Sequence, residues 1–232
     1  MFRRATTTAA LSLATTAAAI TLGAGPAAAT GVSFGAQWNM DDPSIMRDTS
    51  GYSNDGKTTN VTSAGGGYSF NGTTSKVVVP NSDSLNPGTS DFSYSVRVQT
   101  SRVPPSGTDY DLIRKGVSST AGGEYKLEIV YSNGVGKAFC LVKGVKDGVK
   151  VSATVKGTTN VTDGNPHTLT CKKTSTGLTL QVDNLAPRTK VASVGSISNT
   201  SALTISAKTP SITGVSGDFY SGTMLGASLS LI

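Results

Sequence analysis

Residues 92–99 read Phe-Ser-Tyr-Ser-Val-Arg-Val-Gln, with apolar or aromatic side chains at every other position and polar ones between them. Successive side chains of a β-strand point to opposite faces, so this period of two predicts a strand with one face in a core and the other in water. The same alternation recurs in four further segments, at 124–129, 149–155, 178–182 and 225–231. We find no helical periodicity in the same part of the chain.

Short turn signals separate the predicted strands. They combine Asn, Asp, Ser, Gly and Pro, which hairpin turns prefer. The clearest are Asn71-Gly72, Asn86-Pro87-Gly88, Ser132-Asn133-Gly134, Asp147-Gly148, Asp163-Gly164-Asn165-Pro166 and Ser175-Thr176-Gly177. Many short strands joined by such turns predict an all-β fold of two packed antiparallel sheets.

Residues 1–29 have the pattern of an export signal. Arg3 and Arg4 precede an apolar stretch rich in Ala and Thr, and the small residues that signal peptidase requires end at Ala29. The apolar stretch is about fourteen residues long, which is shorter than the roughly twenty that a membrane-spanning helix needs. We therefore expect cleavage after Ala29, an extracellular protein, and one folded domain over residues 30–232.

The chain after the predicted cleavage site is weakly basic. The full sequence has 20 Lys and Arg against 14 Asp and Glu. Removal of Arg3 and Arg4 leaves 18 against 14, a net charge of +4. Because these basic residues are scattered and not interleaved with aromatic ones, we predict no binding of nucleic acid. No later segment is apolar for long enough to insert into a membrane.

Cys140 and Cys171 are the two cysteines of the chain. In an exported protein, such a pair without His or Cys neighbours at metal-binding spacing predicts a disulfide. It would close a loop of about thirty residues and stabilise the fold by roughly 3 to 4 kcal/mol in the chain-entropy model.

Three segments resemble, in this order, bacterial secreted members of the laminin G-like or concanavalin A-like jelly-roll superfamily. They are Trp38-Asn39-Met40-Asp41 with the Asp-x-Ser-Gly-x-x-Asn-x-Gly turn at 48–56, then Tyr68-Ser69-Phe70-Asn71-Gly72 with 91–96, then 163–171 with 178–183. The resemblance implies a jelly-roll sandwich. It also implies a binding or adhesion role, with glycan hydrolases and lyases as the rarer activities of the fold.

This chain departs from the family pattern at two places. Pro166 precedes His167 where relatives have an aromatic residue, and the closing turn at 217–222 is not followed by the acidic residues that are common there. Because of these two departures, we do not assign a ligand site to this chain from the family resemblance.

Glycan cleavage requires two carboxyl groups, about 5 to 5.5 Å apart in retaining enzymes and about 6.5 to 9.5 Å apart in inverting ones. Glu124 and Glu128 are the only glutamates. On one strand face they would lie about 13 Å apart, at roughly 3.3 Å per residue. We expect a solvated strand face with Lys126 between them.

Asp109 and Asp111 have a more suitable spacing, since residues i and i+2 of a strand lie roughly 6 to 7 Å apart on one face. Arg114 and Lys115 follow closely, and we expect them to neutralise this pair at the surface. His167, the only histidine, could act as a general base, but a structural hydrogen bond is the expected role. We therefore assign no catalytic residue.

An acidic loop near the start of the chain is the candidate metal site. Asp41, Asp48, Asn54 and Asp55 offer hard oxygen ligands of the kind that calcium prefers, and Asp218 could join them if the two ends of the chain pair. Relatives on this fold often carry calcium. The alternative is that Asp48 and Asn54 form Asx turns and no ion is bound.

Carbohydrate binding would use exposed aromatic rings, which stack on sugar rings. Tyr110, Tyr131, Tyr52 and Tyr220 lie near predicted turns or strand ends and are the candidates. Trp38 is as suited to the core as to a binding platform.

The leading hypothesis is a secreted, non-catalytic recognition module that binds an extracellular carbohydrate or protein. One alternative is a polysaccharide hydrolase or lyase with an unusual acid and base, drawn from Asp109, Asp111 or His167. The other is a structural protein of the cell envelope.

Overall fold

The computed structural model describes residues 35–210 and 218–232, so the predicted export signal at 1–29 lies outside the described residues. In the described part, regular structure consists of β-strands and one short 3-10 helix, η1 (Asp83–Leu85). No helix in that part is long and apolar enough to cross a membrane.

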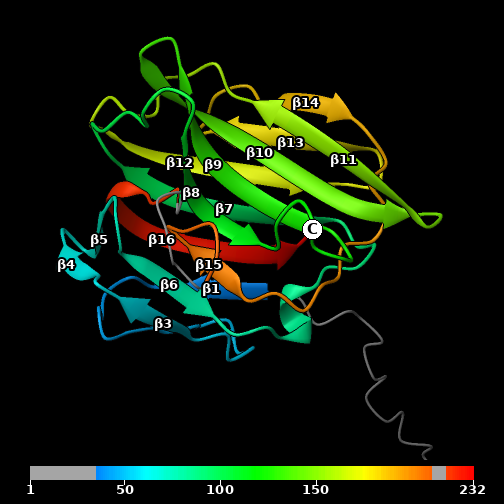
Figure 1. Ribbon diagram of the computed structural model, residues 1–232, viewed down its shortest axis with the longest axis horizontal. Helices are drawn as coiled ribbons and strands as arrows, with labels where there is room; N and C mark the ends of the chain where they lie inside the picture. Colours follow the sequence, from blue (N-terminus) through cyan, green and yellow to red (C-terminus); the bar gives the residue numbers. More distant parts are fainter. Residues whose placement is uncertain (1–34, 211–217) are drawn as a thin grey trace, which may run out of the picture. The chain divides into compact units, whose positions relative to one another are not determined.

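The first of two eight-stranded sheets contains β1 (Gly35–Trp38), β4 (Thr62–Ala64), β5 (Gly67–Asn71), β7 (Phe92–Gln99), β12 (Pro166–Lys173), β13 (Gly177–Val182), β14 (Arg188–Val191) and β16 (Ser221–Leu231). Its strand order is β14-β13-β12-β7-β16-β5-β4, and β1 also pairs with β16. Strands from the middle and the end of the sequence therefore lie side by side in its centre (Figure 1).

The second sheet contains β2 (Ile45–Met46), β3 (Gly56–Thr59), β6 (Lys76–Val79), β8 (Asp109–Lys115), β9 (Glu124–Ser132), β10 (Val135–Lys146), β11 (Val149–Lys156) and β15 (Leu203–Ile205). Its order is β11-β10-β9-β8-β15-β6-β3-β2. Strand pairs in both sheets are antiparallel, which confirms the predicted fold class: an all-β sandwich of two antiparallel sheets.

The alternation in β7 has the predicted consequence. Phe92, Tyr94, Val96 and Val98 are at most 1% exposed, and they face the second sheet. The rings of Phe92 and Tyr94 lie 5.5 and 5.3 Å from the ring of Tyr125 on β9. Burying each such side chain stabilises the fold by roughly 1.5 to 3 kcal/mol, so this row is a major part of the core.

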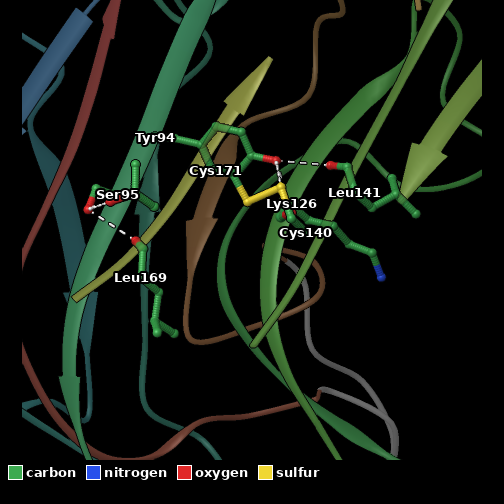
Figure 2. Close-up of a disulfide and its surroundings, with 8 residues drawn as sticks. Tyr94, Ser95, Lys126, Cys140, Leu141, Leu169 and Cys171 are labelled. Atoms are coloured by element: carbon green, nitrogen blue, oxygen red, sulfur yellow. Dashed lines mark hydrogen bonds between the residues drawn. A yellow bond between two sulfur atoms is a disulfide. The ribbon is translucent and has the colours of Figure 1, made fainter. Parts of the chain in front are cut away.

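The predicted disulfide between Cys140 and Cys171 is present. Cys140 lies on β10 and Cys171 on β12, so the bond joins the two sheets through the core. Figure 2 shows the Tyr94 side chain beside this bond. The Tyr94 hydroxyl donates to the carbonyls of Leu141 (3.0 Å) and Lys126 (3.1 Å). The buried hydroxyl is thus provided with acceptors.

Two predicted strands differ from simple alternation. In β16, a bulge between Met224 and Gly226 makes Leu225 the extra residue, so Met224 occupies the core in its place. In β11, Val149 is 63% exposed, because it lies at the tip of a hairpin. The turn there, Asp147-Gly148, has positive φ angles of 52° and 76°, which Asp and Gly tolerate.

Candidate functional site

An open groove lies at one end of the first sheet, where β5, β7 and β16 meet. Antiparallel pairing places Thr223 of β16 between Gln99 of β7 and Ser69 of β5, so one row from three strands shares the outer face. The groove has a volume of about 460 Å³. Its lining consists of Ser69, Phe70, Gln99, Thr100, Ser101, Arg102, Gly164, Ser221, Gly222 and Thr223.

Hydrogen bonds hold the wall of this groove in place. The buried Thr100 hydroxyl donates to the carbonyl of Ser221 (2.6 Å) and accepts the backbone N–H of Arg102 (2.9 Å). The Gln99 side-chain amide donates to the carbonyl of Gly164 (2.9 Å). The segment after β7 is therefore tied both to β16 and to a neighbouring turn, which positions Arg102 at the groove.

Several polar groups of the groove are left without a protein partner. Within the described part of the chain, the hydroxyls of Ser69, Ser101, Ser221 and Thr223 make no hydrogen bond, and Arg102 makes no ion pair. The lining contains no Asp or Glu. The groove therefore offers hydroxyl groups, which both donate and accept, beside one positive charge.

A second cluster lies on the outer face of the second sheet, where three carboxylates surround Arg114. The guanidinium lies 3.0 and 2.8 Å from the two Asp111 oxygens, 3.5 Å from Glu124 and 3.8 Å from Glu128. The prediction of a solvated glutamate pair is wrong, because Glu124 and Glu128 are each 1% exposed and share the arginine. The expected surface position of Asp111 is also wrong, since this residue is fully buried.

Lysines complete the charge balance of this cluster. Lys126 contacts Glu128, as expected from its place between the glutamates, and Lys143 of the neighbouring strand lies 3.4 Å from Glu124. Lys115, which was expected to neutralise the Asp pair, is fully buried and donates only to neutral oxygens. Burial lowers the pKa of Lys115 to about 8.

Asp109 is the least buried carboxylate of the cluster. Oxygens of Asp109, Asp111 and Glu128 lie within 4.8 Å of one another. Burial and the nearby Glu128 carboxylate raise the pKa of Asp109 to about 6. Its Oδ1 is buried and has no hydrogen-bond partner among the described residues. Asp109 also lines a small cleft of about 160 Å³ together with Gly72, Pro105, Thr108, Tyr110, Asp218 and Phe219.

The acidic loop near the start of the chain uses its oxygens internally. The Asp48 carboxylate accepts the backbone N–H groups of Gln37, Ser50 and Asn54, and Asp55 accepts that of Asp48. Within the described ranges, the only three carboxylates that come together are those of the cluster above. This geometry favours the Asx-turn alternative, and calcium binding here stays a prediction.

Of the other three residues of that candidate metal site, two have side chains that are engaged elsewhere. The Asn54 side chain is buried and bonds to the Gly35 carbonyl and to Ser84. The Asp218 carboxylate lies 2.7 Å from Lys208, so it does not join the loop. Asp41 is exposed and no partner of its side chain is found in the described residues.

The four tyrosines proposed as ligand platforms divide into two pairs. Tyr110 and Tyr220 are buried and pack edge to face, with ring centroids 5.8 Å apart, so their prediction as exposed platforms is wrong. The Tyr220 hydroxyl donates to the carbonyls of Gln99 and Thr223 at 3.0 Å. Tyr52 and Tyr131 are exposed by 41% and 37%, but neither lines the groove.

His167 has the structural role that the sequence suggested. Its Nδ1 lies 2.7 Å from Asp183 and its Nε2 3.0 Å from Asp163. Burial disfavours the charged ring, but the hydrogen bonds to Asp183 and Asp163 outweigh burial and raise the pKa of His167. With both nitrogens occupied, the ring fixes two turns against β12 and is not free to act as a base.

The sequence pattern does not single out Arg102, and it predicts only one of the roles of Arg114. Arg102 follows the clearest strand by three positions, so its place at the end of a sheet could have been inferred, but the partner segments at Ser69 and Ser221 could not. Arg114 pairs with Asp111 as expected, although in a buried position, and its further contacts with Glu124 and Glu128 on β9 depend on the strand register.

Comparison with known proteins found no matching family model and no matching curated protein. Solved structures do match. The binding domain of botulinum neurotoxin DC, solved in complex with rat synaptotagmin II, superposes with a TM-score of 0.53 and 14% identity over 83% of this chain and 47% of that one. A Trypanosoma rangeli sialidase, solved with a difluoro-sugar, gives a TM-score of 0.58 and 12% identity over 83% of this chain and 30% of that one.

Domains LG4–5 of the mouse laminin α1 chain also match, with a TM-score of 0.48 and 17% identity over 70% of this chain and 40% of that one. This chain therefore spans less than half the length of each of the three. At these identities the likeness concerns the fold alone. The described residues form a jelly-roll β-sandwich of two antiparallel sheets and share this fold with the neurotoxin binding domain and the sialidase.

Proposed function

We propose that this chain is an extracellular recognition module that binds carbohydrate in the groove between β5, β7 and β16. One observation carries the proposal: four hydroxyls that have no partner among the described residues line an open groove whose wall is held by hydrogen bonds and whose lining contains no carboxylate. Sugar hydroxyls both donate and accept hydrogen bonds, so they complement such a lining. No acid and base pair faces this groove, which supports binding without cleavage.

Two further observations support an extracellular recognition role. The disulfide is of the kind that persists in oxidising compartments. The similar neurotoxin domain was solved with a protein, rat synaptotagmin II, and the similar sialidase with a sugar derivative. Recognition of a protein surface is therefore the alternative outcome for the same module.

The test is a glycan array probed with the disulfide-bonded chain after residue 29, followed by titration calorimetry on the glycans that bind. Thr223→Val and Ser69→Ala, which remove hydroxyls from the groove, should weaken binding at least several-fold. Thr179→Val on β13 removes a hydroxyl from the same outer face away from the groove and serves as the control. Equal weakening by all three variants, or no binding to any glycan, would refute the proposal.

A second candidate function has its own observation. Asp109, with a pKa raised to about 6, lies beside two carboxylates and lines a cleft, which is how a general acid is arranged in glycan-cleaving enzymes. Against it, Asp111 and Glu128 are buried and held by cations, and Asp218, the other carboxylate that lines the cleft, is paired with Lys208. We therefore rank this candidate below recognition.

The enzyme candidate is tested by measuring reducing-end release from common polysaccharides between pH 4 and pH 8. An enzyme that uses Asp109 as its acid should lose activity above about pH 6, where that group ionises, and should lose it at all pH values in Asp109→Asn. Activity that survives the substitution would assign cleavage to another group.

A further inference from the structure

We infer that the groove selects a sugar that carries a carboxylate, such as a uronic or sialic acid, and that the guanidinium of Arg102 binds that carboxylate. This inference rests on the proposed function and adds the chemical class of the ligand. Arg102 is the only residue in the groove lining with an ionisable side chain. The groove is therefore positively charged, and a neutral sugar would leave that charge without a partner.

The surroundings of Arg102 distinguish it from arginines with a structural role. Arg114 contacts three carboxylates and is nearly fully buried, and Arg47 lies 3.8 Å from Asp55. Arg102 is exposed and has no carboxylate partner among the described residues. Its backbone is nevertheless fixed by Thr100, whose hydroxyl bridges it to β16. An arginine that is anchored but unpaired is positioned for an external anion.

The geometry favours a carboxylate over a phosphate or sulfate. The planar guanidinium fork matches the two oxygens of a carboxylate in a bidentate pair. A dianionic phosphate would need more than one cation to neutralise its charge, and the lining of this groove supplies one. The ring hydroxyls of the same sugar can then bond to Ser69, Ser101, Ser221 and Thr223, whose hydroxyls are free to accept or donate.

A sugar acid also fits the lining better than the carboxyl terminus of a peptide does. Recurring modes of peptide recognition use apolar pockets for side chains, an exposed strand edge or, for a terminal carboxylate, a nest of free backbone N–H groups. Phe70 is the only large apolar residue in the lining, and it is 2% exposed. The groove lies over three paired strands, so it presents hydroxyls and not free backbone groups. Peptide binding is retained as an outcome of the test.

The experiment compares the binding of D-glucuronate and N-acetylneuraminate with that of D-glucose. Binding to the disulfide-bonded protein is measured at 50 mM salt from the NMR shifts of its backbone amides. We expect the two acids to bind at least ten-fold more tightly than glucose and to shift the amides of residues 99–102 and 221–223. Arg102→Gln should weaken binding of the acids at least ten-fold. Raising the salt to 500 mM should weaken binding to the wild type but hardly to the variant.

Arg97→Gln is the matched control. Arg97 lies on the same outer face of β7, is exposed, and has no ion pair in the described residues, but it does not line the groove. Equal affinity for glucose and glucuronate, or equal effects of the two arginine substitutions, would overturn the inference. If neutral glycans bind in the groove and acids do not, the inference fails and the recognition function stands. If only a peptide carboxylate binds in the groove, or if no ligand binds, both the sugar-acid inference and the proposed carbohydrate binding fail.

Discussion

Replacing Asp109 with Asn should make the protein more stable at pH 8. Burial and the Glu128 carboxylate raise the pKa of Asp109 to about 6, against 3.8 for the unperturbed group. Because the folded-state pKa lies above the unfolded one, the folded state binds the proton more tightly. The resulting stability is fully present below the unfolded pKa and is lost as the pH rises through 6. Asn resembles the protonated acid at every pH.

The size of the effect follows from the same shift. Two pKa units correspond to about 3 kcal/mol. Asp109 is only partly buried, so solvent screens its repulsion from the other carboxylates, and we expect a gain of about 1 to 2 kcal/mol at pH 8. At pH 4 the wild-type acid is protonated in the folded protein, and the difference should shrink to near zero.

Urea unfolding at both pH values measures this difference through the fluorescence of Trp38, the only tryptophan, which is fully buried and donates to the Asn54 carbonyl. Asp147→Asn is a suitable control, because Asn is equally tolerated in its exposed hairpin turn. An Asp109→Asn variant that is less stable than the wild type at pH 8 would refute the reasoning. So would a gain of the same size at pH 4.

Three further predictions concern stability. Arg114→Met should lower the free energy of unfolding by about 3 to 5 kcal/mol at pH 8, because it leaves buried carboxylates without their cation. At pH 5 the variant should regain part of this stability as the carboxylates become protonated, and a loss that does not depend on pH would contradict the reasoning. Replacing Cys140 and Cys171 by Ala should cost about 3 to 4 kcal/mol by urea unfolding, and a loss below about 1 kcal/mol would contradict the predicted cross-link effect. Because the pKa of His167 is raised in the folded state, the protonated ring stabilises the fold at low pH, and this stabilisation is lost as the pH rises through the folded-state pKa. His167→Gln should therefore lower the urea midpoint more at pH 5.5 than at pH 8.5. NMR titration of the ring checks the pKa directly.

The fold could be predicted because the signal for it is local. Phe92 to Val98 alternate strictly, and a strand that buries one face has no other register that keeps those side chains from water. The same rule failed at Leu225, where a bulge moved Met224 into the core. A bulge depends on the pairing partner, and the sequence of one strand does not contain that information.

The candidate sites were harder to predict because they depend on which strands become neighbours. Alternation correctly places Glu124 and Glu128 on the outer face, but it does not reveal that Arg114 of the next strand lies over them and that both become buried. Tyr220 was misjudged for a related reason. A tyrosine serves equally well in a core or on a surface, and its burial is decided by packing against Tyr110.

The two charged sites differ in what the fold requires of them. Arg114 is buried among carboxylates, so its charge is needed to balance theirs. Its removal should therefore destabilise the fold. Arg102 has no partner among the described residues and lies in solvent, so the folded state loses little without it. Thr100 fixes the backbone of Arg102 beside hydroxyls that have no partner among the described residues, and we propose that a ligand pairs with the guanidinium there.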